Sequence, residues 1–458
     1  MTSLIQRRAG LAAMWLALAL SAVQLSAADS LRWQTNRVSA DIKSGDLYQL
    51  LERIAATTGW HIYVEPDLSH KVSAKFQDLP PAEALHMLLG PVNFALVPET
   101  NASPKLFVFR TTMKNATRLV RPAVPSDVGK AKIIPNELIV RLKPGAKIDE
   151  IAKLLGAKVI GRIDSLNAYR LQFEDAAAAE AARAQLASNP DVTSVDSNFS
   201  LDRPAAPQLA GAVNPAPLSL QLKPPPADGR VIVGVVDTAM QPLCGDLNKF
   251  LLKSISVAGT AQLESGVPSH GTAMAETVLR SVQAMTKGST AVQILPVDVY
   301  GPNASTSTFD VANGVVQAVN GGARIINLSL GSQGDSPFLH GVLQDVKKQN
   351  IPVFAAAGNE PVTTPFYPAA YPEVTAVTAI DQGKVADYAN RGSFVSLGTP
   401  GTSIVCYDGA NYFVVGTSAS SAFASGIAAG YMDSTQNSVS QMQSFMQSSF
   451  GVQMAPGQ

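Results

Sequence analysis

Residues 231–237 read VIVGVVD, an apolar and mostly β-branched run that ends in an aspartate. A run with no polar residue on either face is typical of a strand buried on both faces of a parallel sheet. Two similar runs follow, ARIINLSLGS at 323–332 and PVFAAAGN at 352–359, with helical patterns between them. Residues 230–448 are therefore predicted to form an α/β domain, a parallel sheet with helices on both faces.

Polar residues stand where these strands end or where the next helix begins. Asp237 follows the first strand, His270 opens SHGTAMAETVLRSV, Asn359 follows PVFAAAG, and Ser418 opens the small-residue helix in GTSASSAFASG. In open α/β sheets, sites assemble at the carboxyl ends of the strands. Taken singly, each residue has an ordinary alternative: such an aspartate is commonly a turn residue, and a histidine at a helix start a surface residue.

The order of these residues along the chain is more informative than any one of them. Asp before His before Ser is the subtilisin order, unlike that of chymotrypsin or the α/β-hydrolases. The segments VVDTA, SHGTAMA, AAAGNE and GTSAS resemble the motifs of the subtilase family, as do INLSLG and FYPAAYPEVTAVTAI. The resemblance covers about residues 230–431 and implies a subtilisin-like fold.

The resemblance also implies a serine endopeptidase and assigns a role to each residue. His270 would take the proton of the Ser418 hydroxyl, and Asp237 would hold the imidazole. Asn359 and the Ser418 backbone N–H would stabilise the oxyanion. An extended substrate would pair with a strand edge and fill a pocket walled by small residues. The substrate-binding residues implied in this way are Ser329, Leu330, Gly331, Ala356 and Gly358.

Three residues depart from the subtilase pattern. Ala239 replaces the glycine after Asp-Thr, Glu276 stands where the HGT helix normally has a glycine, and Ala422 replaces the proline that follows the serine motif. A carboxylate at a tightly packed helix position costs free energy unless it is paired or reaches water. Local packing around Glu276 is therefore expected to differ from that of the family.

The chain has two cysteines, Cys244 and Cys406. In an oxidising compartment such a pair can form a disulfide, and two small buried thiols are the equal alternative from the residues alone. The subtilase resemblance brings their segments near each other and so favours the disulfide. No cysteines or histidines have metal-ligand spacing, so no metal site and no cofactor are predicted; calcium is implied by the family resemblance alone.

Residues 134–201 read strand, helix, strand, strand, helix, strand. ELIVRLKPG, IDEIAKLLGAKVIG, AYRLQFE, AAAAEAARAQLAS and DVTSVD carry this pattern, which is that of a ferredoxin-like domain. The arrangement resembles the inhibitory propeptide domain of subtilases, including its ending PDVTSVDSN. That implies an intramolecular chaperone and inhibitor; a generic ferredoxin-like domain is the alternative.

Residues 31–112 form a small α+β domain, with helices in GDLYQLLERIAATTG and PAEALHMLLG and strands after each. The segments VSADIKSGDLYQLLERIAATTG and DLPPAEALHMLLG resemble the short N-terminal domain of secretins and TonB-dependent receptors. The resemblance implies a protein-binding domain in the envelope of a Gram-negative bacterium, with an envelope protein as partner. A spacer without a partner is the alternative.

Residues 1–28 are typical of a cleaved signal peptide, since Arg7 and Arg8 precede an apolar run and small residues follow it. Export to the periplasm or the medium is expected; a retained membrane anchor is the alternative. Residues 113–133 and the proline-rich 202–229 are predicted linkers. If the enzyme cuts itself, the scissile bond lies between Leu201 and Gly229, unless that stretch is a permanent linker.

Composition excludes some partners and leaves two classes of function. Of 458 residues, 46% are hydrophobic and 15% charged, and 35 Lys and Arg balance 35 Asp and Glu. That balance gives no electrostatic footprint for nucleic acid. The chain is then either an active protease made as an autoinhibited zymogen, or a pseudoprotease that serves as an envelope scaffold. Because a scaffold has no need of the four coupled active-site residues, the sequence favours the protease.

Overall fold

The computed structural model describes residues 30–120, 131–210 and 218–452, apart from 35, 36, 59, 67, 69, 100, 101 and 228. The predicted signal peptide, residues 1–28, lies outside the described residues. Among the helices that are described, none combines the length and the apolar character needed to cross a membrane. The chain divides into two compact units, Met1–Val128 and Gly129–Gln458.

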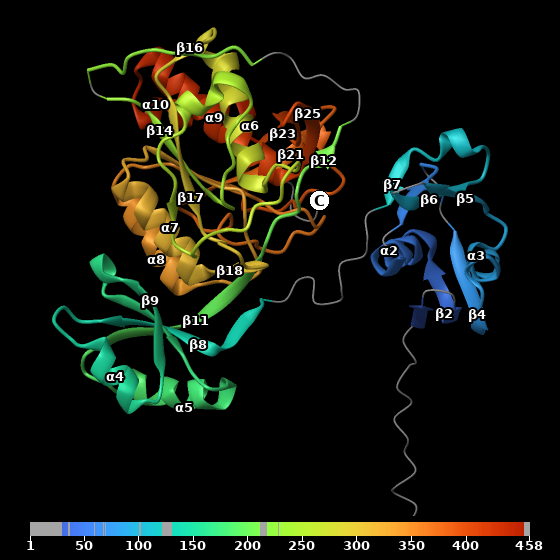
Figure 1. Ribbon diagram of the computed structural model, residues 1–458, viewed down its shortest axis with the longest axis horizontal. Coiled ribbons are helices and arrows are strands. Elements are labelled where there is room, and N and C mark those ends of the chain that lie inside the picture. Colours follow the sequence, from blue (N-terminus) through green and yellow to red (C-terminus); the bar gives the residue numbers. More distant parts are fainter. Residues whose placement is uncertain are drawn as a thin grey trace, which may run out of the picture. The chain divides into compact units, whose positions relative to one another are not determined.

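The described residues of the first unit form two α-helices and two small sheets (Figure 1). Its elements are β1 (Ser30–Gln34), β2 (Arg37–Asp46), α2 (Leu47–Thr58), β3 (His61–Val64), β4 (Lys71–Leu79), α3 (Pro81–Leu89), β5 (Asn93–Glu99), β6 (Ala102–Phe109) and β7 (Arg118–Val120). The sheet orders are β1-β2-β4 and β5-β6-β3-β7. The helical spacing in the sequence sets the core, because Leu47, Leu51 and Ile54 are at most 1% exposed and pack on Ile62 and Val108.

The helices of this unit begin and end where the sequence predicts. Asp46 accepts hydrogen bonds from the backbone N–H groups of Tyr48 and Gln49, at 2.9 and 3.3 Å, and so starts α2. The carboxyl-terminal boundary of this domain differs from the predicted one at residue 112. β7 lies inside the predicted linker 113–133 and pairs antiparallel with β3, because Val120, only 2% exposed, belongs to the core of this unit.

The second unit opens with a ferredoxin-like domain. Its elements are β8 (Ile133–Leu142), α4 (Ile148–Leu154), β9 (Lys158–Ile163), β10 (Ala168–Gln172), α5 (Ala176–Ala187) and β11 (Val192–Asp202), in the order predicted from the sequence. The strand order is β11-β8-β10-β9, and all pairs are antiparallel. Figure 1 shows α4 and α5 on one face of this sheet, with α7 and α8 of the large domain beyond the other face.

The predicted linker 202–229 is partly ordered by strand pairing, which corrects the sequence-based description. The end of β11 pairs with β18 (Ser305–Ser307), β12 (Gln208–Leu209) with β25 (Ala410–Val415), and β13 (Gln221–Leu222) with β16 (Ser289–Thr290). Beyond β13, the Lys223 ammonium lies 3.1 Å from the carboxylate of Asp433, which is 1% exposed. Backbone pairing and this ion pair therefore fix the stretch on both sides of 211–217, which lie outside the described residues.

The large domain is built on a mostly parallel sheet. Its strands run in the order β15 (Ile255–Ser256), β17 (Gln293–Asp298), β14 (Ile232–Asp237), β19 (Ile325–Leu328), β20 (Val353–Ala356), β21 (Thr375–Asp381) and β22 (Lys384–Val385), with β23 (Val395–Pro400) also on β21. Only β22 pairs antiparallel among them. A hairpin of β24 (Thr402–Tyr407) and β25 precedes the last long helix.

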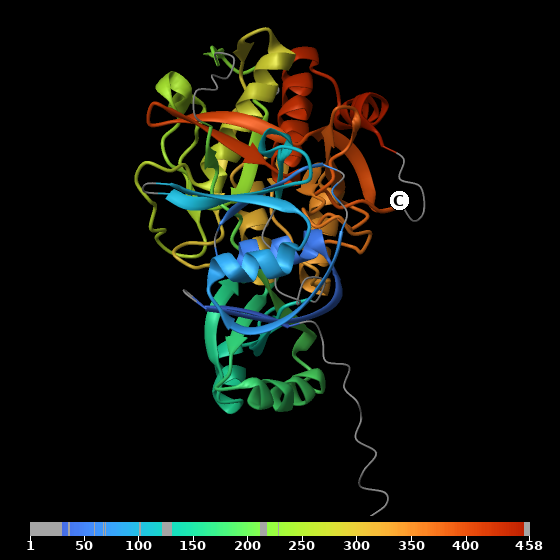
Figure 2. The same cartoon turned by 90° about the vertical axis from the view of Figure 1, so that its right-hand side faces the viewer.

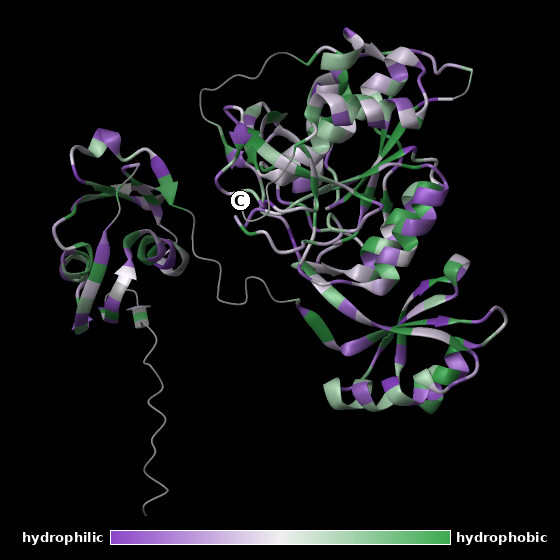
Figure 3. Cartoon of the chain, turned by 180° about the vertical axis from the view of Figure 1, so that it is seen from behind, coloured by the Kyte–Doolittle hydropathy of each residue, from purple (hydrophilic) through white to green (hydrophobic). Residues whose placement is uncertain are grey.

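Helices cover both faces of this sheet, as Figures 1 and 2 show. They are α6 (His270–Thr286), α7 (Thr308–Asn320), α8 (Pro337–Lys348), α9 (Thr417–Thr435) and α10 (Val439–Phe450). Successive residues of β14 point to opposite faces: Val235 packs with α6 and α9, and Val236 with α7 and α8. Hydrophobic colour accordingly runs along the central strands in Figure 3. The predicted fold class is confirmed.

Candidate active site

The carboxyl ends of β14, β19 and β20 and the first turns of α6 and α9 meet at one place, and the predicted residues lie there. Asp237 is the last residue of β14 and is fully buried. One of its carboxylate oxygens accepts a hydrogen bond of 2.6 Å from the Thr238 N–H. Both oxygens also face the ring of His270, so the carboxylate is fixed between backbone and imidazole.

His270 is the first residue of α6, and local contacts hold it there. Ser269 caps the helix by accepting a hydrogen bond from Thr272 N–H at 3.1 Å. The Nδ1 atom of His270 lies 2.9 and 3.0 Å from the two carboxylate oxygens of Asp237. Gly271 has to be glycine, because a Cβ atom there would lie 2.2 Å from the carbonyl oxygen of Thr238. Close contact between helix and strand end thus brings the two side chains together.

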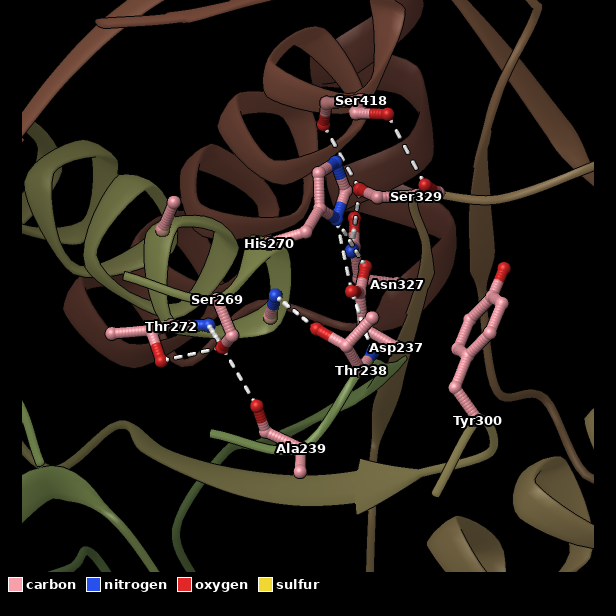
Figure 4. A network of polar contacts seen from close by, with 12 residues as sticks. Asp237, Thr238, Ala239, Ser269, His270, Thr272, Tyr300, Asn327, Ser329 and Ser418 are labelled. Carbon is pink, nitrogen blue, oxygen red and sulfur yellow. Dashed lines mark hydrogen bonds and ion pairs between the residues drawn. The ribbon is translucent and has the colours of Figure 1, made fainter. Parts of the chain in front are cut away.

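Ser418 is the second residue of α9 and is half-buried. Its hydroxyl donates to the carbonyl of Ser329 at 3.1 Å, and the Ser329 hydroxyl donates to the Ser418 carbonyl at 2.9 Å. Figure 4 shows the His270 ring with Asp237 on one side and Ser418 on the other. Because the Ser418 proton is directed to Ser329, the hydroxyl must rotate before the imidazole can accept that proton.

Asn359 projects from the end of β20 beside the start of α9. Its amide oxygen accepts from the Thr417 N–H at 2.8 Å and from the Thr417 hydroxyl at 3.1 Å. The NH2 group is thereby left as the donor, next to Gly416, where a Cβ atom would lie 3.1 Å from it. Asn359 is exposed, so this donor is open to a bound molecule.

The five predicted substrate-binding residues lie on two adjacent strand ends. Ser329 contacts Ser418 directly, as described above. The Gly358 N–H donates to the Thr417 hydroxyl at 3.1 Å, and its φ of +109° suits glycine. Leu330 and Ala356 are buried, at 4% and 3% exposed. Gly331 lies just before a short antiparallel bridge between Ser332 and Tyr367.

Sequence reasoning missed a buried polar residue beneath the site. Asn327, fully buried in β19, donates to the Ser329 hydroxyl at 2.9 Å. Its oxygen accepts from the hydroxyls of Ser421 and Ser425 on α9, at 2.9 and 3.1 Å. Asn327 therefore ties the strand to the helix that carries Ser418. The available signal was a polar residue inside the otherwise apolar strand IINL.

The structure explains how Glu276 is accommodated. Its carboxylate, 1% exposed, pairs with the Arg280 guanidinium at 2.6 Å and accepts the Cys406 N–H at 3.0 Å from each oxygen. Burial raises the pKa of Glu276, against the lowering effects of Arg280 and the Cys406 amide. Cys406 is also joined to Cys244 by a disulfide, with Cα atoms 5.9 Å apart. The packing around Glu276 therefore differs from the family pattern, as expected, because Arg280 and the Cys406 amide bind its carboxylate.

The other two departures from the subtilase pattern, Ala239 and Ala422, are small side chains. Ala239 supplies a carbonyl that accepts from the Ser269 hydroxyl at 2.6 Å, beside the cap of α6. Ala422 is fully buried in α9. Within the described ranges, no group of three or more His, Cys, Asp or Glu side chains is placed to hold a metal ion. Calcium stays a prediction from the family resemblance.

The ferredoxin-like domain is fastened to the large domain by buried polar groups. Arg170 of β10 binds both carboxylate oxygens of its own domain's Glu137, at 2.7 and 2.9 Å, and reaches Asp310 of α7 at 2.8 Å. Asn198 of β11 accepts from the Thr308 hydroxyl and the Phe309 N–H at the start of α7, at 3.0 and 3.1 Å. This domain and the large domain therefore share one hydrogen-bond network.

Comparison with known proteins gives consistent matches. The Subtilase family profile matches residues 228–453, and the Fervidolysin N-terminal prodomain profile matches residues 121–198. The chain is 31% identical over 207 residues to the thermophilic serine proteinase of Bacillus sp. strain AK1, covering 43% of this chain and 51% of that protein. It is 30% identical over 186 residues to Subtilisin Savinase of Lederbergia lenta, covering 38% of this chain and 69% of that protein.

Among solved structures, fervidolysin from Fervidobacterium pennivorans, a keratinolytic enzyme related to subtilisin, superposes with a TM-score of 0.51. The sequence identity is 18%, and the match covers 68% of this chain and 56% of that one, so this likeness concerns the fold. The chain spans about half the length of the first curated relatives that it matches, 51% and 52%.

Proposed function

The chain belongs to the subtilase family, and on this premise we propose that it is a serine endopeptidase that cuts peptide bonds through Asp237, His270 and Ser418. The observation that carries the proposal is the contact of His270 Nδ1 with both oxygens of the buried Asp237 carboxylate, at 2.9 and 3.0 Å. Ser418 lies on the other side of the ring (Figure 4). The imidazole of the base His270 therefore lies between the nucleophile Ser418 and the carboxylate of Asp237 that orients it.

The first chemical step is attack of the Ser418 oxygen on the scissile carbonyl. The hydroxyl turns from the Ser329 carbonyl towards His270 Nε2, which takes its proton. Asp237 holds the Nδ1–H tautomer and stabilises the imidazolium without becoming protonated. His270 then protonates the leaving amine, and water hydrolyses the acyl-enzyme by the same route in reverse.

Charge on the tetrahedral intermediate would be met by two donors. One is the NH2 group of Asn359, whose oxygen is already occupied by Thr417, and the other is the backbone N–H of Ser418 at the start of α9. The helix N-terminus favours negative charge at the same place. In subtilisin, a member of the same family, losing the equivalent asparagine costs about 10²–10³-fold in turnover.

An extended substrate would add as a strand beside Ser329, Leu330 and Gly331, with Ala356 and Gly358 beside the first pocket. The support is their position at the carboxyl ends of β19 and β20, next to Ser418. Main-chain pairing of this kind depends little on sequence, so the pocket would set the preference.

We further propose that residues 134–201 act as an intramolecular inhibitor in a zymogen. The match of residues 121–198 to a prodomain supports this, as do the buried contacts of Arg170 and Asn198 with α7. Beyond β11, the N–H of Arg203 donates to the Ala304 carbonyl at 2.9 Å, and Gln208 pairs with Phe413. The residues between these two anchors are the best candidates for the self-processing cut.

The test uses the full chain and its Ser418→Ala variant. The wild type should react with an organophosphonate at Ser418, cleave unfolded casein, and show by intact mass a cut between Arg203 and Gln208. The Ser418→Ala variant should do none of these. If the cut persists in the variant, self-processing is wrong; if the wild type neither labels nor cleaves, the pseudoprotease scaffold becomes the better account.

Export and the envelope partner are also proposals. Export rests on the signal-peptide pattern of residues 1–28, and the partner on the likeness of residues 31–112 to the secretin and TonB-receptor domain. Cell fractionation of the natural host would test the first, with a periplasmic or extracellular protein as the expected result. Cross-linking in intact cells, with and without residues 31–112, would test the second.

A further inference from the structure

The segment that leads into the proposed cut is bound to the large domain by its backbone. The end of β11 pairs antiparallel with β18, with Leu201 facing Thr306. The Arg203 N–H extends this pairing by donating to the Ala304 carbonyl at 2.9 Å. Because Arg203 lies on the amino-terminal side of the proposed cut, it stands where a substrate residue close before the scissile bond would stand.

The side chain of Arg203 is held by three neutral groups of one turn in the large domain. Its Nε atom donates to the Asn303 carbonyl at 2.9 Å, and its Nη2 atom donates to the Gly301 carbonyl at 2.7 Å. The guanidinium carbon lies over the Tyr300 ring, 5.2 Å from its centre. A cation over a ring face and charge-assisted hydrogen bonds each stabilise binding. The guanidinium therefore uses two carbonyl groups and a ring face at once.

The turn that binds Arg203 is fixed by contacts within the large domain. Asp298, which is 5% exposed, accepts hydrogen bonds from the N–H groups of Tyr300 and Gly301, each at 3.0 Å. The Asn303 N–H donates to the Tyr300 carbonyl at 3.1 Å. These N–H groups are thus engaged inside the domain, while the carbonyl groups of Gly301 and Asn303 face the guanidinium. The negative charge of Asp298 beneath the turn also favours a bound cation.

This turn lies next to the proposed active site. Tyr300 comes two residues after β17, and the N–H of Val299 donates to the Asp237 carbonyl at 3.0 Å (Figure 4). Tyr300 is fully buried, and its hydroxyl donates to the Asp202 carbonyl at 3.2 Å. Departure of the segment after the cut would therefore open the ring and the two carbonyl groups to another polypeptide.

We propose that the Tyr300 ring and the carbonyl groups of Gly301 and Asn303 form a guanidinium-binding site, and that the enzyme prefers polypeptides with an arginine at the place of Arg203. The inference rests on the proposed peptidase function. In the uncut chain Arg203 fills the site, and after the cut a substrate arginine replaces it. Arginine is preferred to lysine, because its rigid fork of N–H donors reaches both carbonyl groups while its plane stacks on the ring.

The first test needs no variant of the enzyme. Four internally quenched peptides copy residues 201–208, LDRPAAPQ, and differ only at the third residue, which is arginine, lysine, citrulline or leucine. For the processed wild-type enzyme, kcat/KM should be about tenfold higher with arginine than with leucine, mainly through KM, and lysine should lie between them. Citrulline resembles arginine in shape but carries no charge, so it should also fall well below arginine.

The second test changes the ring. Tyr300→Leu should reduce the arginine-to-leucine ratio of kcat/KM from about tenfold to about twofold or less. Tyr300→Phe is the matched control, because it keeps the ring face and removes only the hydroxyl that binds the Asp202 carbonyl. It should keep the full ratio, whatever its effect on the two rates together. If Tyr300→Leu does not fold, the comparison of arginine with citrulline and leucine in the wild type still tests the site.

Equal kcat/KM for the arginine, citrulline and leucine peptides would overturn the proposal. A folded Tyr300→Leu variant that keeps the full preference would overturn it as well, because the preference would then arise elsewhere. Failure of the proposed function is distinguishable, since a wild type without peptidase activity would not label at Ser418 and would cut none of the four peptides. That outcome would remove the substrate preference together with its premise.

Discussion

The two small α+β domains use their polar side chains differently. In residues 30–120, Lys75 pairs with Asp41 at 2.7 Å, and Glu65 accepts from the Thr111 hydroxyl at 2.6 Å, both within the domain. In residues 133–202, Arg170 completes its set of partners only with Asp310 of the large domain. The Arg170 contact thus crosses a domain boundary, whereas the other two contacts stay inside one domain.

This difference bears on what each domain can do. If a domain's buried charges are paired by a neighbouring domain, dissociation leaves those charges without a partner and costs free energy. Such a domain suits an inhibitor that stays bound until it is cut or degraded. A domain with its own core and internal ion pairs can be carried as a separate module. The contact patterns thus agree with an inhibitory role for one domain and an accessory role for the other.

The largest effect is expected for Arg170→Ala. The change leaves Glu137, which is 4% exposed, and Asp310, which is 17% exposed, without their cation. Breaking a buried pair in this way costs about 3–5 kcal/mol. Denaturant unfolding of the second unit, in a Ser418→Ala background that cannot cut itself, should show this loss.

The control for that change is Arg162→Ala in the same small domain. Arg162 pairs with Asp149 at the surface, where the two side chains are 40% and 72% exposed. Its loss should cost less than about 1 kcal/mol. Equal losses for the two arginines would mean that the shared network does not fasten the domain.

Leu51→Ala should destabilise the first unit alone. Leu51 is fully buried in the core of that unit, and truncation of such a leucine costs about 2–5 kcal/mol. Calorimetry of the full chain should show one transition moving to lower temperature while that of the second unit stays in place. Met87→Ala, at a side chain 50% exposed, is the control and should move neither. A shift of both transitions would contradict the independence of the first unit.

Asp310→Asn should reveal a pH dependence in the shared network. Burial is the main cause that raises the pKa of Asp310 above 3.8, against the effect of Arg170. The folded state therefore binds the proton more tightly than the unfolded state, and this group adds stability as the pH falls through its folded pKa towards 3.8. The free energy of unfolding of the wild type, minus that of the variant, should rise over that range. A difference that falls with the pH would contradict this sign.

The smallest effect is expected for deletion of residues 30–120. Because that domain has its own core, its loss should leave the rate at which the full chain cuts itself within about twofold of the wild-type rate. The disappearance of the uncut chain, followed by intact mass, is the measurement. A large fall in that rate would show that the two units cooperate in catalysis.

Strand and helix periodicity predicted most of the fold, because the decisive patterns are local. VIVGVVD reads as a buried strand by itself, and Asp46 or Ser269 marks a helix start within a few residues. The order of Asp237, His270, Asn359 and Ser418 indicated one site because parallel strands end at a common edge.

The contacts that the sequence could not predict join residues far apart along the chain. Glu276 was recognised as unusual, but its partner Cys406 lies 130 residues away on a hairpin. Arg170 and Asp310 are 140 residues apart and belong to different domains. β7, with three residues, is too short for a pattern, and only its pairing with β3 identifies it.

Lys223 and Asp433 limit how far the enzyme can be trimmed. A catalytic chain shortened to begin at Arg230 would keep the Asp433 carboxylate, 1% exposed, with the hydroxyl of Thr290 and the amide of Ala291 but no cation. It would also lose the pairing of β13 with β16. The smallest stable form of the enzyme therefore begins before Gln221. An aminopeptidase that removes residues from the new amino terminus should stop before Gln221.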